Sequence, residues 1–231
     1  MRVALDARYV REKPSGIGVY VQSLVDRLPE AAPADHFSFW AHRLAPRPLS
    51  RALNTSEVTV RPGPNSPWPL FWPGRYATFT DVDVFHSPHN LMPCAIPCAS
   101  VVTVHDVMAL EHPRLHLQGV ERLVKSRYYQ KAVLRALWRA TRLIAPSKAT
   151  ANRICSIAPG AARRMEVILE APDPCFRLPV DLSATRNQAT TLIRSDAPYL
   201  LVVGANAPTK RHELALHAFA AAALPPAWRL V

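Results

Sequence analysis

The sequence has no apolar run near the 18 or so residues that a membrane-spanning helix needs, so it predicts no such helix. It also lacks a secretory signal, because residues 1–6 contain no apolar stretch or cleavage site and predict a strand instead. We therefore expect a cytoplasmic protein.

Cysteine is scarce: the chain has Cys94, Cys98, Cys155 and Cys175. In a cytosolic chain of this size, these predict free thiols rather than a disulfide framework. Two of the cysteines lie near three histidines, His86, His89 and His105. Zinc is an alternative, but the Cys-x3-Cys spacing is wider than the usual Cys-x2-Cys and Pro97 intervenes. We expect no metal and no cofactor.

Acidic residues are few, 17 against 28 Lys and Arg, which gives a formal charge of +11. Such a charge favours polyanions: nucleic acid, an anionic lipid surface or a phosphate-bearing ligand. The richness in Ala, Arg and Pro also indicates that genomic base composition contributes. No recognisable nucleic-acid module is present, so we expect no nucleic-acid partner.

Predicted strands and helices alternate along residues 1–169, which indicates an α/β fold: a three-layer, Rossmann-like domain with a mostly parallel sheet. The expected strands are 2–7, 36–41, 57–61, 83–86, 100–104, 142–146 and 165–169. The expected helices run from 19 up to Pro29, over 119–140 and over 148–157. Residues 170–197 lose periodicity and predict a linker. Residues 198–231 predict the start of a second α/β domain, with a buried strand at 199–204, so the chain looks truncated relative to a two-domain protein.

The most informative stretch is 100–113, where a run of small and β-branched residues ends in His105 and Asp106. Ligands bind at the carboxyl ends of strands in an open parallel sheet, so this pair is a candidate for chemistry. The alternative is structural: a hydrogen-bonded core histidine, and an aspartate that caps the next turn.

A second candidate is the loop Ser15-Gly16-Ile17-Gly18 between the first strand and the first helix. Its glycines let backbone N–H groups approach an anion at the helix N-terminus. The dinucleotide fingerprint G-x-G-x-x-G is absent, and a plain tight turn also explains this loop.

Two further features have both a functional and a structural interpretation. Trp68 and Trp72, in a proline-rich loop over 62–74, are either a stacking surface for a sugar or apolar acceptor, or loop packing, which we favour. The predicted helix 119–140 carries a basic row spaced by four residues, Arg127, Lys131, Arg135 and Arg139. Such a row suits an anionic membrane, although a solvated helix face is the commoner case.

Five segments, in order, resemble motifs of the family 4 retaining glycosyltransferases, especially the mannosyltransferase-like group. They are Leu5-Asp6-Ala7-Arg8 with residues 15–20, Val102-Thr103-Val104-His105-Asp106 with His112-Pro113, and residues 145–150, 167–176 and 199–210. The resemblance implies two Rossmann-like domains in the glycosyltransferase B arrangement, with acceptor bound mainly by the first and nucleotide-sugar by the second.

The reaction implied by the resemblance is metal-independent transfer of a mannose-like hexose with retention. The donor would be a nucleotide-sugar such as GDP-mannose and the acceptor a glycan or a lipid-linked sugar, with peripheral contact at the inner face of an anionic membrane. By matching motif positions, Gly16 approaches the donor diphosphate, His105 contacts the donor sugar, and Lys210 neutralises the departing diphosphate. We place Ser15, Asp106 and Trp72 on the acceptor side.

The sequence departs from the family pattern at three points. The family's Asn-Gly before the linker is Glu170-Ala171, and the family's Arg beside the lysine is Thr209, for which Arg211 is a substitute. The acidic segment and the nucleoside site would lie beyond residue 231. The alternative function is therefore a non-catalytic, truncated domain that binds an acceptor or a partner protein.

Overall fold

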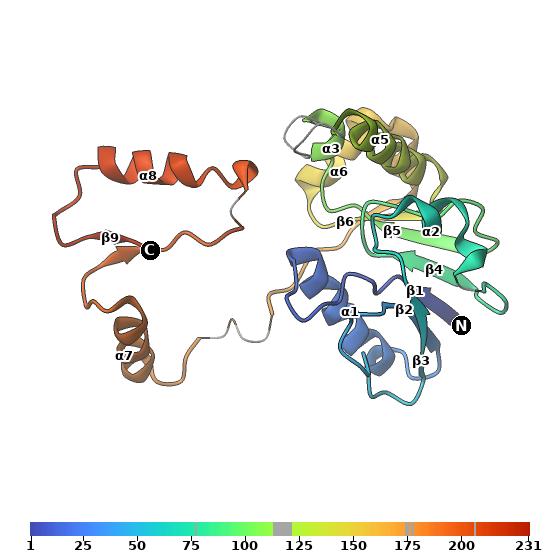
Figure 1. The fold of residues 1–231 in the computed structure, drawn as a ribbon, viewed down its shortest axis with the longest axis horizontal. Helices are drawn as coiled ribbons and strands as arrows, with labels where there is room; N and C mark the ends of the chain where they lie inside the picture. Colours follow the sequence, from blue (N-terminus) through green and yellow to red (C-terminus); the bar gives the residue numbers. More distant parts are fainter. Residues whose placement is uncertain (77, 113–121, 174–175, 177, 206) are drawn as a thin grey trace. The chain divides into compact units, whose positions relative to one another are not determined.

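The computed structural model describes all residues except 77, 113–121, 174–175, 177 and 206, drawn in grey in Figure 1. The chain divides into two units, Met1–Ala171 and Pro172–Val231, and we describe each by itself. Parts of the predicted segments lie outside the described residues: Pro113, the helix start at 119–121, Cys175 and position 206 of the segment 199–210. In the described part, no helix is long and apolar enough to cross a membrane.

The first unit contains the predicted strands and helices, but its third strand directly follows the second and its fifth directly follows the fourth. Its strands are β1 (Arg2–Leu5), β2 (His36–His42), β3 (Thr55–Val60), β4 (Val84–Ser87), β5 (Ala99–Thr103), β6 (Arg142–Ala145) and β7 (Met165–Val167). Its helices are α1 (Gly16–Ala31), α2 (Pro67–Phe71), α3 (Met108–Glu111), α5 (Arg122–Arg139) and α6 (Lys148–Ile157), with 3-10 turns η1 (Pro73–Arg75) and η2 (Pro159–Arg164).

The seven strands form one parallel sheet in the order β3-β2-β1-β4-β5-β6-β7 (Figure 1). The chain runs outward from β1 to β3, then returns to the other side of β1 and continues to β7. The connection order therefore reverses between β1 and β4, where parallel open sheets form a crevice for ligands. This arrangement confirms the predicted Rossmann-like α/β fold.

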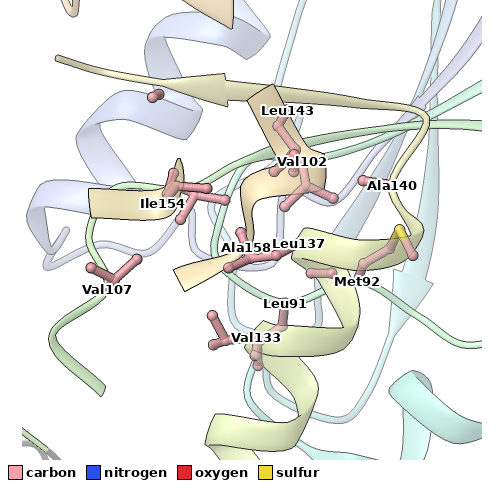
Figure 2. Close-up of a cluster of buried hydrophobic side chains, with 14 of the residues drawn as sticks. Leu91, Met92, Val102, Val107, Val133, Leu137, Ala140, Leu143, Ile154 and Ala158 are labelled. Carbon is pink, nitrogen blue, oxygen red and sulfur yellow. The ribbon is translucent and has the colours of Figure 1, made fainter. Parts of the chain in front are cut away.

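Helices cover both faces of the sheet. Leu5 and Phe39 are paired in register and pack with Val21 and Val25 of α1. Val102 and Leu143 are also paired in register, and they pack against Leu137 of α5 (Figure 2). The register through β4 places these two sets of side chains on opposite faces, because alternate residues of a strand point to opposite sides. The cluster of Figure 2 is thus the core beneath α5.

Side-chain caps begin three of the described helices, α1, α6 and a helix of the second unit. The Ser147 hydroxyl accepts from the Thr150 N–H at 3.1 Å and starts α6, as the sequence predicts. The prediction that the first helix ends at Pro29 was wrong, because α1 continues to Ala31. The Asn54 amide donates to the Pro29 carbonyl at 3.2 Å, so a distant side chain meets an acceptor of the last turn.

The predicted loop over 62–74 also needs correction, because it contains α2 and part of η1. Pro67 and Pro73 occupy first positions of these elements, where proline needs no N–H partner. Proline here starts short helical turns rather than excluding them.

The second unit contains α7 (Leu182–Ile193), β8 (Tyr199–Leu200), η3 (Pro208–Lys210), α8 (His212–Ala221) and β9 (Arg229–Leu230). Helix α7 lies in the segment expected to be an irregular linker. Its Asp181 cap accepts from the Ala184 N–H at 2.9 Å, and none of its residues is buried, so it lacks the apolar periodicity that would have predicted it.

The strand expected to be buried at 199–204 is short and exposed. Only residues 199–200 pair, with β9, and Val203 is 84% exposed. The apolar run predicted a strand covered on both faces, but β9 is its one partner strand among the described residues, and both lie at the surface of their unit.

Candidate functional site

Polar side chains gather at one edge of the sheet, because parallel strands end at the same edge. Residues at or just after the ends of β1, β4, β5, β6 and β7 are Asp6, Arg8, Ser87, His89, Asn90, His105, Asp106, Ser147 and Glu170. Several are fully buried, although polar side chains are seldom buried unless they are paired. This edge is the candidate site.

His105 is held at both its backbone and its ring. Its N–H donates to Asn90 Oδ1 at 2.9 Å, and its carbonyl accepts from the Thr150 hydroxyl at 3.3 Å. Its ring Nδ1 lies 2.9 Å from Glu170 Oε1, and its Nε2 lies 3.0 Å from the Pro88 carbonyl. The contacts come from the segments after β4 and β7 and from α6, so the whole edge fixes the histidine.

Helix α1 meets the same histidine through Tyr20. The two rings pack edge to face, with centroids 4.9 Å apart. The Tyr20 hydroxyl lies 3.2 Å from Thr103 Oγ1, which in turn lies 3.0 Å from His86 Nε2. The second turn of α1 is therefore joined to the end of β5 by direct contacts.

His86 lies deep in this network, and burial lowers its pKa to about 4, with the neighbouring histidines contributing. Its folded pKa lies below the ordinary value of about 6.5. The unfolded chain then binds more protons between these two pH values, so stability is complete above about pH 6.5 and is lost as the pH falls toward 4.

We therefore expect His86→Gln to weaken the acid sensitivity of the fold. Between about pH 7 and pH 5, the variant should lose roughly 1–2 kcal/mol less unfolding free energy than wild type. Denaturant titrations at both pH values measure this difference. Equal losses in the two proteins would show that His86 does not contribute to it.

Beside this network lies a buried triad, in which the Asp6–Arg8 ion pair also contacts the ring of His89. Arg8 Nη2 lies 2.6 Å from Asp6 Oδ2, and His89 Nε2 lies 3.0 Å from the same oxygen. Burial alone would raise the pKa of Asp6, but the Arg8 guanidinium and the His89 hydrogen bond hold it well below its usual range. Burial lowers the pKa of His89, so a neutral ring donates to the carboxylate.

The triad anchors the loops that flank the site. Arg8 Nη1 donates to the carbonyl of Gly63 at 3.0 Å, which ties the end of β1 to the loop after β3. The backbone carbonyl of Arg8 accepts a hydrogen bond from Arg11 Nε at 3.2 Å. The Asp6-Ala7-Arg8 motif thus holds the loop that leads into α1.

The N-terminus of α1 has the features of an anion site. Ser15 caps it, accepting from the Gly18 N–H at 3.2 Å, and its first turn carries no acidic residue. Gly18 is required by packing, because a Cβ there would lie 2.8 Å from the Tyr9 carbonyl oxygen. No described residue lies within 4 Å of the corresponding Cβ position at Gly16, so the packing of the described part of the chain does not explain that glycine.

Asp106 has the structural role that the sequence allowed. Its Oδ1 accepts from the Met108 N–H at 2.9 Å at the start of α3, and its carbonyl accepts from Asn90 Nδ2 at 3.1 Å. The exposed side chain orders the turn after His105, and its acceptor-side role stays a prediction.

The aromatic loop and the basic helix, which are distant in sequence, meet around one pocket. The pocket has a volume of about 180 Å³ and lies between α2, α5 and the loop after β4. Its lining residues are Leu70, Phe71, Met92, Cys94, Tyr128, Lys131, Ala132 and Arg135. The Tyr128 hydroxyl is buried and has no hydrogen-bond partner among the described residues, and burial raises its pKa to about 12.

Around the pocket, aromatic and cationic side chains reach solvent. Trp68 and Trp72 stack with centroids 5.5 Å apart, and both are more than half exposed. Arg127 and Lys131 are exposed as well. Arg135 differs, because its guanidinium donates to the Met92 and Pro93 carbonyls and so belongs to the wall rather than to a free basic row.

Lys210 and Arg211 belong to the second unit, so the structure does not relate them to His105. Lys210 ends η3 and is exposed. Arg211 adopts a left-handed backbone conformation with φ 51°, and its guanidinium pairs with Glu213 at 3.0 Å. Because its guanidinium is paired with Glu213, Arg211 is less available to a phosphate than the exposed Lys210.

The match to a family model decides the family, because residues 14–173 fit the model of Glycosyltransferase Family 4. The chain belongs to glycosyltransferase family 4. Among solved structures it resembles WaaG, a glycosyltransferase involved in lipopolysaccharide biosynthesis, with a TM-score of 0.67 and 14% identity. The match covers 100% of this chain and 62% of that chain. None of the curated proteins matches.

Within this family member, the sequence analysis identified His105 as a candidate but missed most of the residues that hold it. Glu170 was noted only as a departure from the family pattern, and Tyr20 was not singled out at all. Both contact the His105 ring. The buried polar side chains around His105 mark the site, and their burial can be read only from the folded structure.

Proposed function

We propose that this family member transfers a mannose-like hexose, with retention, from a nucleotide-sugar such as GDP-mannose to a glycan or lipid-linked acceptor. The observation that carries the proposal is the contact of His105 with Tyr20, in the second turn of α1, at the carboxyl edge of the sheet. A sugar and a diphosphate are adjacent in the donor, so their binding groups must be adjacent too.

The chemistry of the leaving group assigns the roles. As the bond to the sugar breaks, negative charge grows on the diphosphate, and fixed N–H groups and cations stabilise it. The α1 N-terminus beside Gly16 supplies backbone N–H groups, and Lys210 supplies a point charge. His105 contacts the sugar, while no metal or cofactor takes part.

Donor binding tests this function directly. We expect one nucleotide-sugar from a panel that includes GDP-mannose to bind the chain in the micromolar range by calorimetry. Release of nucleoside diphosphate on addition of acceptor would show transfer. A folded chain that binds no donor would favour the alternative, a module that binds an acceptor or partner protein.

Lys210→Ala should weaken nucleoside diphosphate binding about tenfold, because a lost charge–phosphate contact is worth about 1.4 kcal/mol. Titration with the diphosphate measures the change. Lys131→Ala, the same substitution on α5, should leave the affinity unchanged. Equal affinities in Lys210→Ala and wild type would remove this lysine from the donor site.

The pocket between α2 and α5 supports a lipid-linked acceptor at an anionic membrane. Its apolar lining suits an alkyl chain, and the exposed Arg127 and Lys131 suit the phosphates of a lipid surface. The stacked Trp68 and Trp72 are amphipathic rings of the kind found at membrane interfaces. We propose peripheral contact through this surface.

Arg127→Glu should reduce binding to vesicles that contain phosphatidylglycerol by about tenfold, because it removes a basic residue that contributes about 1 kcal/mol near an anionic surface and adds a carboxylate that the surface repels. Sedimentation with vesicles measures the bound fraction, and added salt should lower it. Arg27→Glu makes the same charge change at an exposed site on α1. If the wild-type chain bound neutral vesicles as well as vesicles that contain phosphatidylglycerol, the basic row would be a solvated face of the helix.

A further inference from the structure

Both ring nitrogens of His105 face hydrogen-bond acceptors. Nδ1 lies 2.9 Å from a carboxylate oxygen of Glu170, and Nε2 lies 3.0 Å from the Pro88 carbonyl oxygen. Both oxygens act as hydrogen-bond acceptors, so a neutral ring donates to one of them and a protonated ring donates to both. When the ring is protonated, its contact with Glu170 is an ion pair.

The pair joins two parts of the site edge. His105 follows β5, whereas Glu170 follows β7 and is the penultimate residue of the first unit. The His105 side chain is only 14% exposed and Glu170 is 44% exposed, so the ring is enclosed while its partner reaches solvent. Tyr20 packs against the ring edge to face and completes its enclosure.

We propose that Glu170 is a positioning residue for His105: it fixes the ring through Nδ1 and keeps the histidine as a hydrogen-bond donor rather than a proton acceptor. This inference deepens the proposed function and rests on it only for its consequence in catalysis. A histidine held in this way has its Nδ1 engaged by Glu170, so that nitrogen does not serve as a general base.

Nuclear magnetic resonance of the histidine-¹⁵N-labelled, full chain tests the pair without any donor. At about pH 6, where an ordinary histidine is largely protonated, the bonded Nδ1–H of His105 should give a slowly exchanging, low-field proton resonance. His105→Ala assigns this resonance by removing it. Glu170→Ala should abolish it through exchange with water, and Glu170→Gln, which keeps an oxygen acceptor, should retain it with faster exchange.

Glu166→Ala is the matched control, because this exposed carboxylate lies on β7, four residues earlier. It should leave the resonance unchanged. A resonance absent from wild type, unchanged in Glu170→Ala or equally lost in Glu166→Ala would overturn the proposal.

The catalytic consequence is read separately by a double-mutant cycle on donor turnover. Glu170→Ala should reduce turnover about tenfold in the wild-type background and hardly at all beside His105→Ala, since coupled residues are not additive. Additive losses would overturn the positioning role. A chain that binds no donor but keeps the resonance would refute the proposed transfer and leave the Glu170–His105 pair standing.

Discussion

Asp6→Ala should lower the free energy of unfolding by about 3–5 kcal/mol, which is the usual cost of removing one partner of a buried ion pair. The Asp6 and Arg8 side chains are both fully buried, with 0% exposed. Removal of the carboxylate leaves the Arg8 charge without its counter-ion and the His89 Nε2 hydrogen without its acceptor. Denaturant titration of both proteins gives the difference.

The control is Asp26→Ala, which removes an exposed carboxylate from α1 and should change stability by less than about 0.5 kcal/mol. A loss below about 1 kcal/mol in Asp6→Ala would mean that the triad does not anchor the loops that flank the site. Because the same triad holds the loop before α1, the variant should also bind donor more weakly than its residual stability explains.

Low pH should also destabilise the fold through Asp6. Asp6 has a folded-state pKa held below its unfolded value, so its contribution is complete above about pH 3.9 and is lost as the pH falls toward the folded value. Asp6→Ala removes this part of the acid sensitivity, while the part from His86 lies at higher pH and remains.

His105→Ala should lower donor turnover at least about 100-fold while the protein stays folded. The ring is the group at the donor sugar in the proposed function. The backbone contacts of His105 to Asn90 and Thr150 do not involve the ring, so the alanine variant keeps them. Release of nucleoside diphosphate measures turnover, and circular dichroism verifies the fold.

His36→Ala provides the comparison, because His36 begins β2 at the opposite edge of the sheet and is exposed. Its turnover should equal that of wild type. Wild-type rates in His105→Ala would exclude this histidine from the site, and equal losses in the two variants would indicate a general effect on folding.

The alternation of strands and helices was readable from the sequence, since buried parallel strands are short apolar runs and their helices repeat with a period near 3.6. Ser147 likewise marked the start of α6. Helix α7 was missed, because none of its residues is buried and a helix without an apolar face has no pattern to detect.

By itself, the sequence determined the α/β class, the position of His105 after a buried strand and the family resemblance, because these depend on local order along the chain. Only the tertiary structure decided what surrounds His105: Glu170 lies 65 residues away in sequence and Pro88 lies 17 away. The sheet order brings their segments to one edge, and no local pattern encodes that proximity. The same holds for the pocket where the aromatic loop meets the basic helix.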